Sequence, residues 1–230
     1  MTKQLKALFL AAVVAGASFL ATPAQAGFTL TLHETGFADV VVTDAGHPGS
    51  IAFIGSFGDF TINIHTSQST GATGQPPAFI QTTTNTTRNG VAGLKTLTVT
   101  ATDDQFTYPT AGLVTMGSSF TGTSAIGTTG ADLFSFVSAL NGSAGTTLTG
   151  TAPGTNGNFD AGRVNNTKTA TSPYTLSNAT TITLGANEQG ATTGNTTVSP
   201  MPAPAGIALL LSGAPVLGIG AWFRRRMTRV

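Results

Sequence analysis

Residues 97–101 read Leu-Thr-Val-Thr-Ala, so aliphatic side chains alternate with threonine hydroxyls at a period of two. This period is typical of a β-strand with one buried face and one wet face, because successive side chains point to opposite sides of a sheet. The same alternation recurs at 28–32, 60–64 and 181–184. Threonine is β-branched and favours the strand conformation. These segments predict antiparallel sheet structure.

Further strands are expected where short runs stand between Gly, Asn, Asp and Pro turns, namely at 40–43, 51–57, 78–84, 113–116 and 159–164. Residues 131–140 fit a short helix or a strand, and we favour the strand. About ten short strands without amphipathic crossover helices predict an all-β fold, an antiparallel β-sandwich over residues 27–184. Residues 141–158 and 185–199 have the Gly, Thr and Asn composition of mobile loops.

Threonine supplies the polarity of this domain in place of charge. It fills 40 of the 173 positions from 27 to 199, whereas charged residues make up 8% of the whole chain, against about 25% in an average soluble protein. The chain has no cysteine, which excludes disulfides, thiolate metal sites and a cysteine nucleophile. The expected surface of the domain is therefore neutral and rich in hydroxyl groups.

Charge is distributed unevenly along the chain. The formal net charge is +1, but six of the ten basic residues lie in the first six or the last seven positions. The middle keeps four basic residues and all nine acids, which gives it a net charge of −5. A negative domain without a basic stripe is unsuited to nucleic acid, so we exclude nucleic-acid partners.

The segment 1–26 has the three parts of a secretory signal peptide. Lys3 and Lys6 precede an apolar run, and Ala24 and Ala26 form a small-x-small cleavage site. We expect this N-terminal signal helix to engage the export machinery and to be removed by signal peptidase. The protein is therefore predicted to be exported.

A second apolar run, residues 207–223, carries no charge and is followed at once by Arg224, Arg225 and Arg226. As a helix it would extend about 26 Å, close to the thickness of a bilayer core. The Arg cluster favours a cytoplasmic tail, with the preceding domain outside. We therefore expect a C-terminal transmembrane helix that holds the exported precursor at the inner membrane.

The expected linker, residues 185–206, ends in a proline-bearing motif, Pro202-Ala203-Pro204. This motif, the apolar helix and the basic tail over 224–230 together resemble the tripartite PEP-CTERM sorting signal, whose usual Pro-Glu-Pro is here Pro-Ala-Pro. The resemblance covers residues 199–230 and implies processing by an exosortase-like membrane protease. A generic tail anchor is the competing interpretation. The β domain also resembles domains of PEP-CTERM surface proteins, for which no activity is generally assigned.

Residues suited to catalysis are few and scattered. The chain has three histidines, whose spacing is not diagnostic of a metal site: His33, His47 and His65. His33-Glu34 begins like a zincin helix, but no second histidine follows at the required spacing. There is no G-x-S-x-G elbow and no phosphate loop. We predict that the protein is not an enzyme and has no cofactor or metal site.

Two kinds of ligand stay open for the β domain. Loop aspartates could bind calcium through their oxygens, the candidates being Asp44, Asp59, Asp103 and Asp104. Loop hydroxyls could bind polysaccharide, although stacking on sugar rings usually uses exposed aromatics, and the domain has only Tyr108 and Tyr174 besides phenylalanine.

The sequence therefore predicts a non-catalytic exported protein of the cell surface or extracellular matrix, delivered by a C-terminal sorting signal. Its expected partners are the export machinery, signal peptidase, an exosortase-like protease, the membrane at least transiently, and exopolysaccharide. The alternative is a secreted β-sandwich module that binds polysaccharide or calcium.

Overall fold

The structure is a computed structural model that describes residues 27–44, 49–70, 76–90, 92–125, 132–152 and 157–201, without the side chains of 65–67. This part of the chain forms thirteen β-strands and no helix, in two antiparallel sheets. Within the same residues we find no helix long and apolar enough to span a bilayer. The predicted all-β class and the antiparallel sandwich are confirmed.

The seven-stranded sheet has the spatial order β10, β8, β12, β6, β1, β2, with the short β9 paired to β8. Its strands are β1 (Thr29–Glu34), β2 (Val40–Thr43), β6 (Lys95–Phe106), β8 (Asp132–Leu140), β9 (Ser143–Ala144), β10 (Leu148–Ala152) and β12 (Tyr174–Leu184). The alternation at 97–101 lies in β6, where Leu97, Val99 and Ala101 are completely buried. In the segment 131–140, for which a strand was favoured over a helix, the described residues Asp132–Leu140 form β8.

The six-stranded sheet has the spatial order β11, β7, β13, β5, β4, β3. Its strands are β3 (Ser50–Phe57), β4 (Phe60–Ser69), β5 (Ala78–Arg88), β7 (Ala111–Ala125), β11 (Gly157–Thr171) and β13 (Gln189–Pro200). β7 and β11 have 15 residues each, so this sheet is built from longer strands than the sequence patterns predicted.

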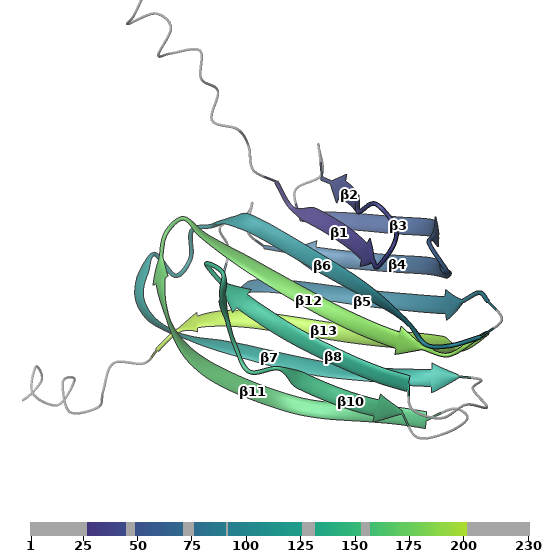
Figure 1. The fold of residues 1–230 in the computed structure, drawn as a ribbon. Helices are drawn as coiled ribbons and strands as arrows, with labels where there is room; N and C mark the ends of the chain where they lie inside the picture. Colours follow the sequence, from purple (N-terminus) through teal and green to yellow (C-terminus); the bar gives the residue numbers. More distant parts are fainter. Residues whose placement is uncertain are drawn as a thin grey trace, which may run out of the picture. The chain divides into compact units, whose positions relative to one another are not determined.

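The two sheets lie face to face, with β6 and β12 over β5 and β13 (Figure 1). Their inner faces share one hydrophobic core. Phe120 of β7 stacks on Phe136 of β8 at a ring-centroid distance of 5.4 Å, and Phe159 of β11 stacks on Phe134 of β8 at 4.9 Å. Burial of these rings removes a large apolar area from water and drives the sheets together.

A chain of buried hydrogen bonds runs through this core and crosses between the sheets at every step. Ser118 of β7 donates to Ser138 of β8 at 2.9 Å, and Ser138 is bonded to Thr196 of β13. Thr196 donates to Asn178 Oδ1 of β12 at 2.6 Å, and Asn178 Nδ2 donates to the Ile80 carbonyl of β5 at 3.0 Å. Five strands are therefore joined by one polar network, whose members form hydrogen bonds with one another.

Glycines on β13 leave space for aromatic rings of the other sheet. A Cβ atom on Gly194 would lie 2.3 Å from the Phe136 ring, and one on Gly190 would lie 2.9 Å from the Phe134 ring. Both distances are shorter than real Cβ contacts allow, so the high glycine content serves close packing here as well as turns.

Two expectations about loops are wrong. Residues 185–199 were predicted to begin a flexible linker, but residues 189–200 form β13, a central strand between β7 and β5. The segment 141–158, also predicted to be a loop, contains β9 and β10 and the start of β11. Glycine and threonine were interpreted as loop composition, whereas β pairing and ring packing use them here. The sandwich consequently extends past residue 184.

Candidate functional site

The outer face of the six-stranded sheet is covered by neutral polar side chains. Along β5 every second residue from Ala78 to Arg88 is buried, which turns Gln81, Thr83, Asn85 and Thr87 to the outer side. The antiparallel register places Thr193 of β13 opposite Thr83, and their hydroxyl oxygens lie 3.3 Å apart. Threonine and amide groups thus form rows that run across the strands.

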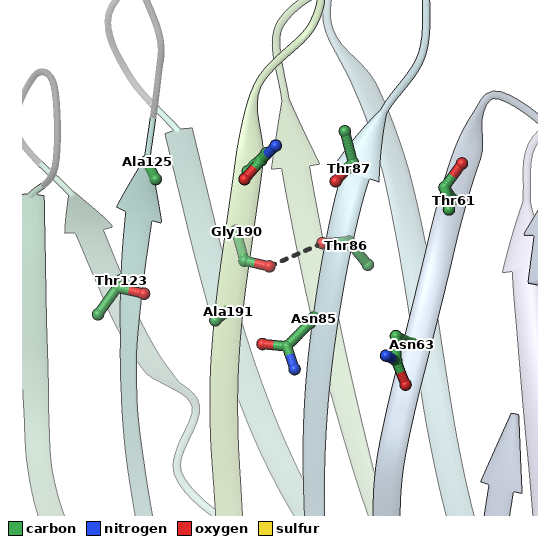
Figure 2. A pocket seen from close by; sticks show the side chains of 10 residues that line it. Thr61, Asn63, Asn85, Thr86, Thr87, Thr123, Ala125, Gly190 and Ala191 are labelled. Atoms are coloured by element: carbon green, nitrogen blue, oxygen red, sulfur yellow. Dashed lines mark hydrogen bonds between the residues drawn. The ribbon is translucent and has the colours of Figure 1, made fainter. Parts of the chain in front are cut away.

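A hollow of about 190 Å³ opens on this face. It is lined by Thr61, Asn63, Asn85, Thr86, Thr87, Thr123, Ala125, Gln189, Gly190 and Ala191. These residues come from β4, β5, β13 and β7, which are neighbours in the sheet. Figure 2 shows lining side chains and the hydrogen bond from Thr86 Oγ1 to the Gly190 carbonyl, 3.1 Å long. None of the described lining residues is charged.

Small residues give the hollow its depth. Ala191 lies directly opposite Asn85 in the β13–β5 pair, and Asn85 lies opposite Asn63 in the β5–β4 pair. The methyl group of Ala191 therefore lies lower than the flanking amides and the Thr123 side chain. A second hollow of about 260 Å³ shares Thr123 and Ala191 with the first and continues onto β11.

One acceptor in the lining has no hydrogen-bond partner. Asn63 Oδ1 is buried and unpaired among the described residues. An amide oxygen left in this state is unfavourable. The hydroxyls and amides of the other lining residues give the hollow both donors and acceptors, and the described lining carries no charge.

A carboxyl pair lies at the same end of the strands, on the inner side. Asp132 at the start of β8 and Glu188 just before β13 are 5% and 3% exposed. The Ser124 hydroxyl of β7 donates to Asp132 Oδ2, and the Gly185 N–H donates to Glu188 Oε2. Burial, followed by the contact with Glu188, raises the pKa of Asp132 to about 6.

The structure does not bring the candidate calcium ligands together. Asp103 is buried and accepts from Ser69 Oγ at 2.5 Å and from the Gln105 N–H at 3.0 Å. Asp44 accepts from the Ser50 N–H at 3.3 Å, and Asp59 pairs with Lys95 Nζ at 2.9 Å. Within the described ranges no group of three potential metal-binding side chains is found.

The remaining candidates are the histidines and Tyr174. His33 Nδ1 lies 2.7 Å from Asp39 Oδ1, both side chains being about half exposed; His47 and the side chain of His65 lie outside the described residues. Tyr174 is buried, stacks on Phe106 at 5.5 Å and donates to the Tyr108 carbonyl at 2.5 Å. Its burial raises the pKa of its phenol. Tyr174 is therefore a core residue.

The predicted targeting residues all lie outside the described part of the chain. They are the cleavage-site residues Ala24 and Ala26, the sorting motif Pro202, Ala203 and Pro204, and the basic cluster Arg224, Arg225 and Arg226. The signal segment 1–26, the apolar run 207–223 and the tail 224–230 lie outside it too.

The strand patterns in the sequence do not indicate the hollow, although one repeat points to two of its strands. Residues 82–87 read Thr-Thr-Thr-Asn-Thr-Thr and residues 192–197 read Thr-Thr-Gly-Asn-Thr-Thr. These two similar hexapeptides lie on β5 and β13, which pair directly. The repeat would have indicated that the second segment is a strand and that the two carry equivalent polar faces.

Comparison with known proteins gives only distant likenesses. No family model matches the chain, and no curated protein matches it. Among solved structures, the carbohydrate-binding module TmCBM61 in complex with β-1,4-galactotriose is 8% identical, with 64% of this chain and 92% of that chain covered and a TM-score of 0.30. The GH26-CBM35 β-(1,4)-mannanase of Podospora anserina is 13% identical, with 67% and 29% covered and a TM-score of 0.27. The VP2 subviral particle of infectious bursal disease virus is 11% identical, with 77% and 53% covered and a TM-score of 0.24.

Proposed function

We propose that this chain is an exported, non-catalytic protein of the cell surface or extracellular matrix, and that its sandwich binds neutral polysaccharide. The observation that carries the proposal is the uncharged hollow lined by hydroxyl and amide groups on β4, β5, β13 and β7. Sugar hydroxyls both donate and accept hydrogen bonds, as do the Thr, Asn and Gln side chains of the lining. An anionic polymer would find no cation among the described lining residues.

The binding we expect is weak at each site. No aromatic ring lines either hollow in the described chain, so stacking on sugar rings contributes nothing there. Each hydrogen bond contributes only about 1 kcal/mol, and association itself costs free energy, so a single site holds its sugar weakly. Useful retention then requires a polymer that offers many equivalent sugars to many copies of the protein at a surface.

Affinity electrophoresis of the purified full chain tests this proposal. Neutral polysaccharides in the gel are expected to retard the protein, and anionic ones are not. The double variant Asn63→Ala/Asn85→Ala removes two amides from the hollow and is expected to migrate unretarded. Asn165→Ala removes an exposed amide on β11 and serves as the matched control. Equal retardation of all three proteins, or none in any neutral polymer, would contradict the proposal.

Export and sorting are part of the same proposal and rest on the sequence. The signal-like segment 1–26 and the PEP-CTERM-like segment 199–230 support delivery to the surface through the export machinery and an exosortase-like protease. Mass spectrometry of the protein taken from the cell surface is expected to find Gly27 at the N-terminus and a C-terminus upstream of Val230. A chain intact through Val230 would support permanent anchoring in place of sorting by cleavage.

A further inference from the structure

The carboxyl pair beneath the hollow connects the two sheets. Asp132 belongs to β8 of the seven-stranded sheet, whereas Ser124 belongs to β7 of the six-stranded sheet and Glu188 directly precedes β13 of the same sheet. Asp132 receives the Ser124 hydroxyl and contacts the Glu188 carboxyl. The Gly185 N–H donates to Glu188 Oε2, and Gly185 lies near Asp132, because Asp132 directly precedes Leu133, which pairs with Thr183.

The pair is buried with one oxygen unsatisfied. Asp132 Oδ1 has no hydrogen-bond partner among the described residues. Two ionised carboxylates in contact in a buried place repel each other, whereas a single shared proton turns the contact into a hydrogen bond. The interaction between the two carboxyl groups is therefore repulsive when both are ionised and attractive when they share a proton.

Other charged groups at this end of the sandwich are engaged elsewhere. The Arg88 N–H of β5 donates to the Glu188 carbonyl at 2.8 Å, while its guanidinium donates to the carbonyls of Ala92 and Gly93 at 2.9 and 2.8 Å. The remaining charges there interact with one another and with Arg88: Glu34 of β1, Asp59 before β4 and Lys95 of β6. Glu188 is the charged residue that acts on Asp132.

We propose that Asp132 and Glu188 form a proton-dependent clamp, which ties β8 to β7 and β13 when the pair is protonated and loosens the end of the hollow when both acids are charged. Thr123 and Ala125, on either side of Ser124, line the hollow, as do Gln189 and Gly190, which follow Glu188. The clamp stands on the buried pair alone; its effect on ligand binding rests on the proposed function.

The direction of the pH effect follows from the raised pKa of Asp132. The folded state holds the proton of Asp132 up to about pH 6, whereas an ordinary Asp has a pKa of 3.8. The stabilisation is therefore complete below about pH 4 and is lost as the pH rises through about 6. Acid conditions tighten this end of the sandwich, and neutral conditions loosen it.

Urea unfolding of the full chain from about pH 4.5 to about pH 7.5 tests the clamp. Asp132→Asn places an amide donor beside Glu188 at every pH and mimics the protonated clamp, while Asp160→Asn removes an exposed carboxyl of β11 as the control. Relative to Asp132→Asn, the unfolding constant of the wild type is expected to rise at least about tenfold over this range. Asp160→Asn should follow the wild type. Parallel curves for wild type and Asp132→Asn would overturn the proposal.

A second measurement needs no variant. Carbon NMR of the Asp132 carboxyl in the wild-type chain is expected to titrate with a midpoint of about pH 6. A midpoint below about pH 4.5 would overturn the clamp.

A calcium control tests whether the carboxyl pair binds a cation. Calcium chloride, compared with a chelator at neutral pH, should leave the stability unchanged. If calcium stabilises the wild type but not Asp132→Asn, the pair binds a cation and the proton clamp is wrong.

Polysaccharide binding at two pH values tests whether the clamp affects the hollow, and it also tests the proposed function separately from the clamp. Retardation by neutral polysaccharide is expected to be stronger at about pH 5 than at about pH 7.5 in the wild type, and equal at both in Asp132→Asn. If no polymer binds while the stability difference is present, the clamp stands and the proposed function fails. If binding occurs without any pH dependence in the wild type, the link from clamp to hollow is refuted.

Discussion

Asn178 Nδ2 on β12 donates a 3.0 Å hydrogen bond to the main-chain carbonyl of Ile80 on β5, in the facing sheet. Asn178 is completely buried, and its Oδ1 accepts from Thr196. A buried amide is costly unless its groups are paired, so each of these bonds constrains how the sheets can be placed against each other. Apolar contacts alone would tolerate more sliding than this network does.

The first prediction concerns that amide. Asn178→Ala removes the donor to the Ile80 carbonyl and the acceptor of the Thr196 hydroxyl, which keeps its bond to Ser138. We expect a loss of about 2–4 kcal/mol in the free energy of unfolding. Asn158→Ala removes an exposed amide on β11 and should change it by about 0.5 kcal/mol or less. Urea unfolding followed by circular dichroism measures both. Equal effects would show that the network contributes no stability.

The second prediction concerns the space that glycine leaves for a ring. Gly194→Ala would force a methyl group against Phe136, which is completely buried, and we expect a destabilisation of about 1–3 kcal/mol. Gly55→Ala on β3 meets only an ordinary contact, 3.6 Å from the Phe53 ring, and should be close to neutral. Thermal unfolding distinguishes the two. A neutral Gly194→Ala variant would mean that the ring can move aside without cost.

The third prediction concerns the exposed ion pair of Asp59 and Lys95. The hydrogen bond to the Lys95 ammonium lowers the pKa of Asp59, and the same bond raises the pKa of Lys95. The pair therefore stabilises the fold above the ordinary pKa of Asp, and this contribution is lost as the pH falls through the lowered value. It is also lost at alkaline pH, once the pH passes the raised pKa of Lys95.

Lys95→Met should abolish this pH dependence with only a small change in stability, because both side chains are more than one-third exposed. The difference from the wild type should shrink further at high salt. Lys168→Met serves as the control, since Lys168 bonds the Ser143 hydroxyl and the Ala144 carbonyl, and no carboxylate among the described residues. Unfolding midpoints in acid at low and high salt provide the measurement. A salt-independent effect of Lys95→Met would contradict it.

The fourth prediction concerns β13, which lies between β7 and β5. A chain that ends after Glu188 loses this central strand, together with Thr196 and Val198 from the core. We expect it to show no cooperative unfolding, whereas a chain that ends after Met201 should unfold cooperatively. Circular dichroism during a thermal scan separates the outcomes. Cooperative unfolding of the shorter chain would mean that residues 189–200 are dispensable.

Strands with apolar residues on one face could be predicted from the sequence. In β1, β4, β6 and β12 the inward positions hold mostly leucine, isoleucine, valine or phenylalanine, and the period of two is visible. β13 could not be found in this way. Its inward positions hold Gly190, Thr192, Gly194 and Thr196 before the first large apolar residue, Val198. Its burial depends on rings and hydroxyls of the other sheet, which a single segment does not reveal.

The hexapeptide repeat on β5 and β13 points to two strands of the hollow, but the hollow itself could not be predicted from the sequence for a related reason. It joins Asn63, Asn85, Thr123 and Ala191, which lie far apart in the chain and become neighbours only through strand order and register. The carboxyl pair is similar, because Asp132 and Glu188 belong to different strand ends and each is unremarkable in its own segment. Local patterns define strands, whereas a site built across strands depends on how they are ordered.

The central claim is that neutral polysaccharide binds in the hollow on the six-stranded sheet. Titration of the isotope-labelled full chain with a neutral polysaccharide fragment, followed by amide NMR, tests it most directly. We expect the shift changes to centre on Asn63, Asn85 and Thr123, with the two Asn side-chain amides among the most affected, and to vanish in Asn63→Ala/Asn85→Ala. Shift changes confined to the seven-stranded sheet, or unaltered in the double variant, would contradict the claim.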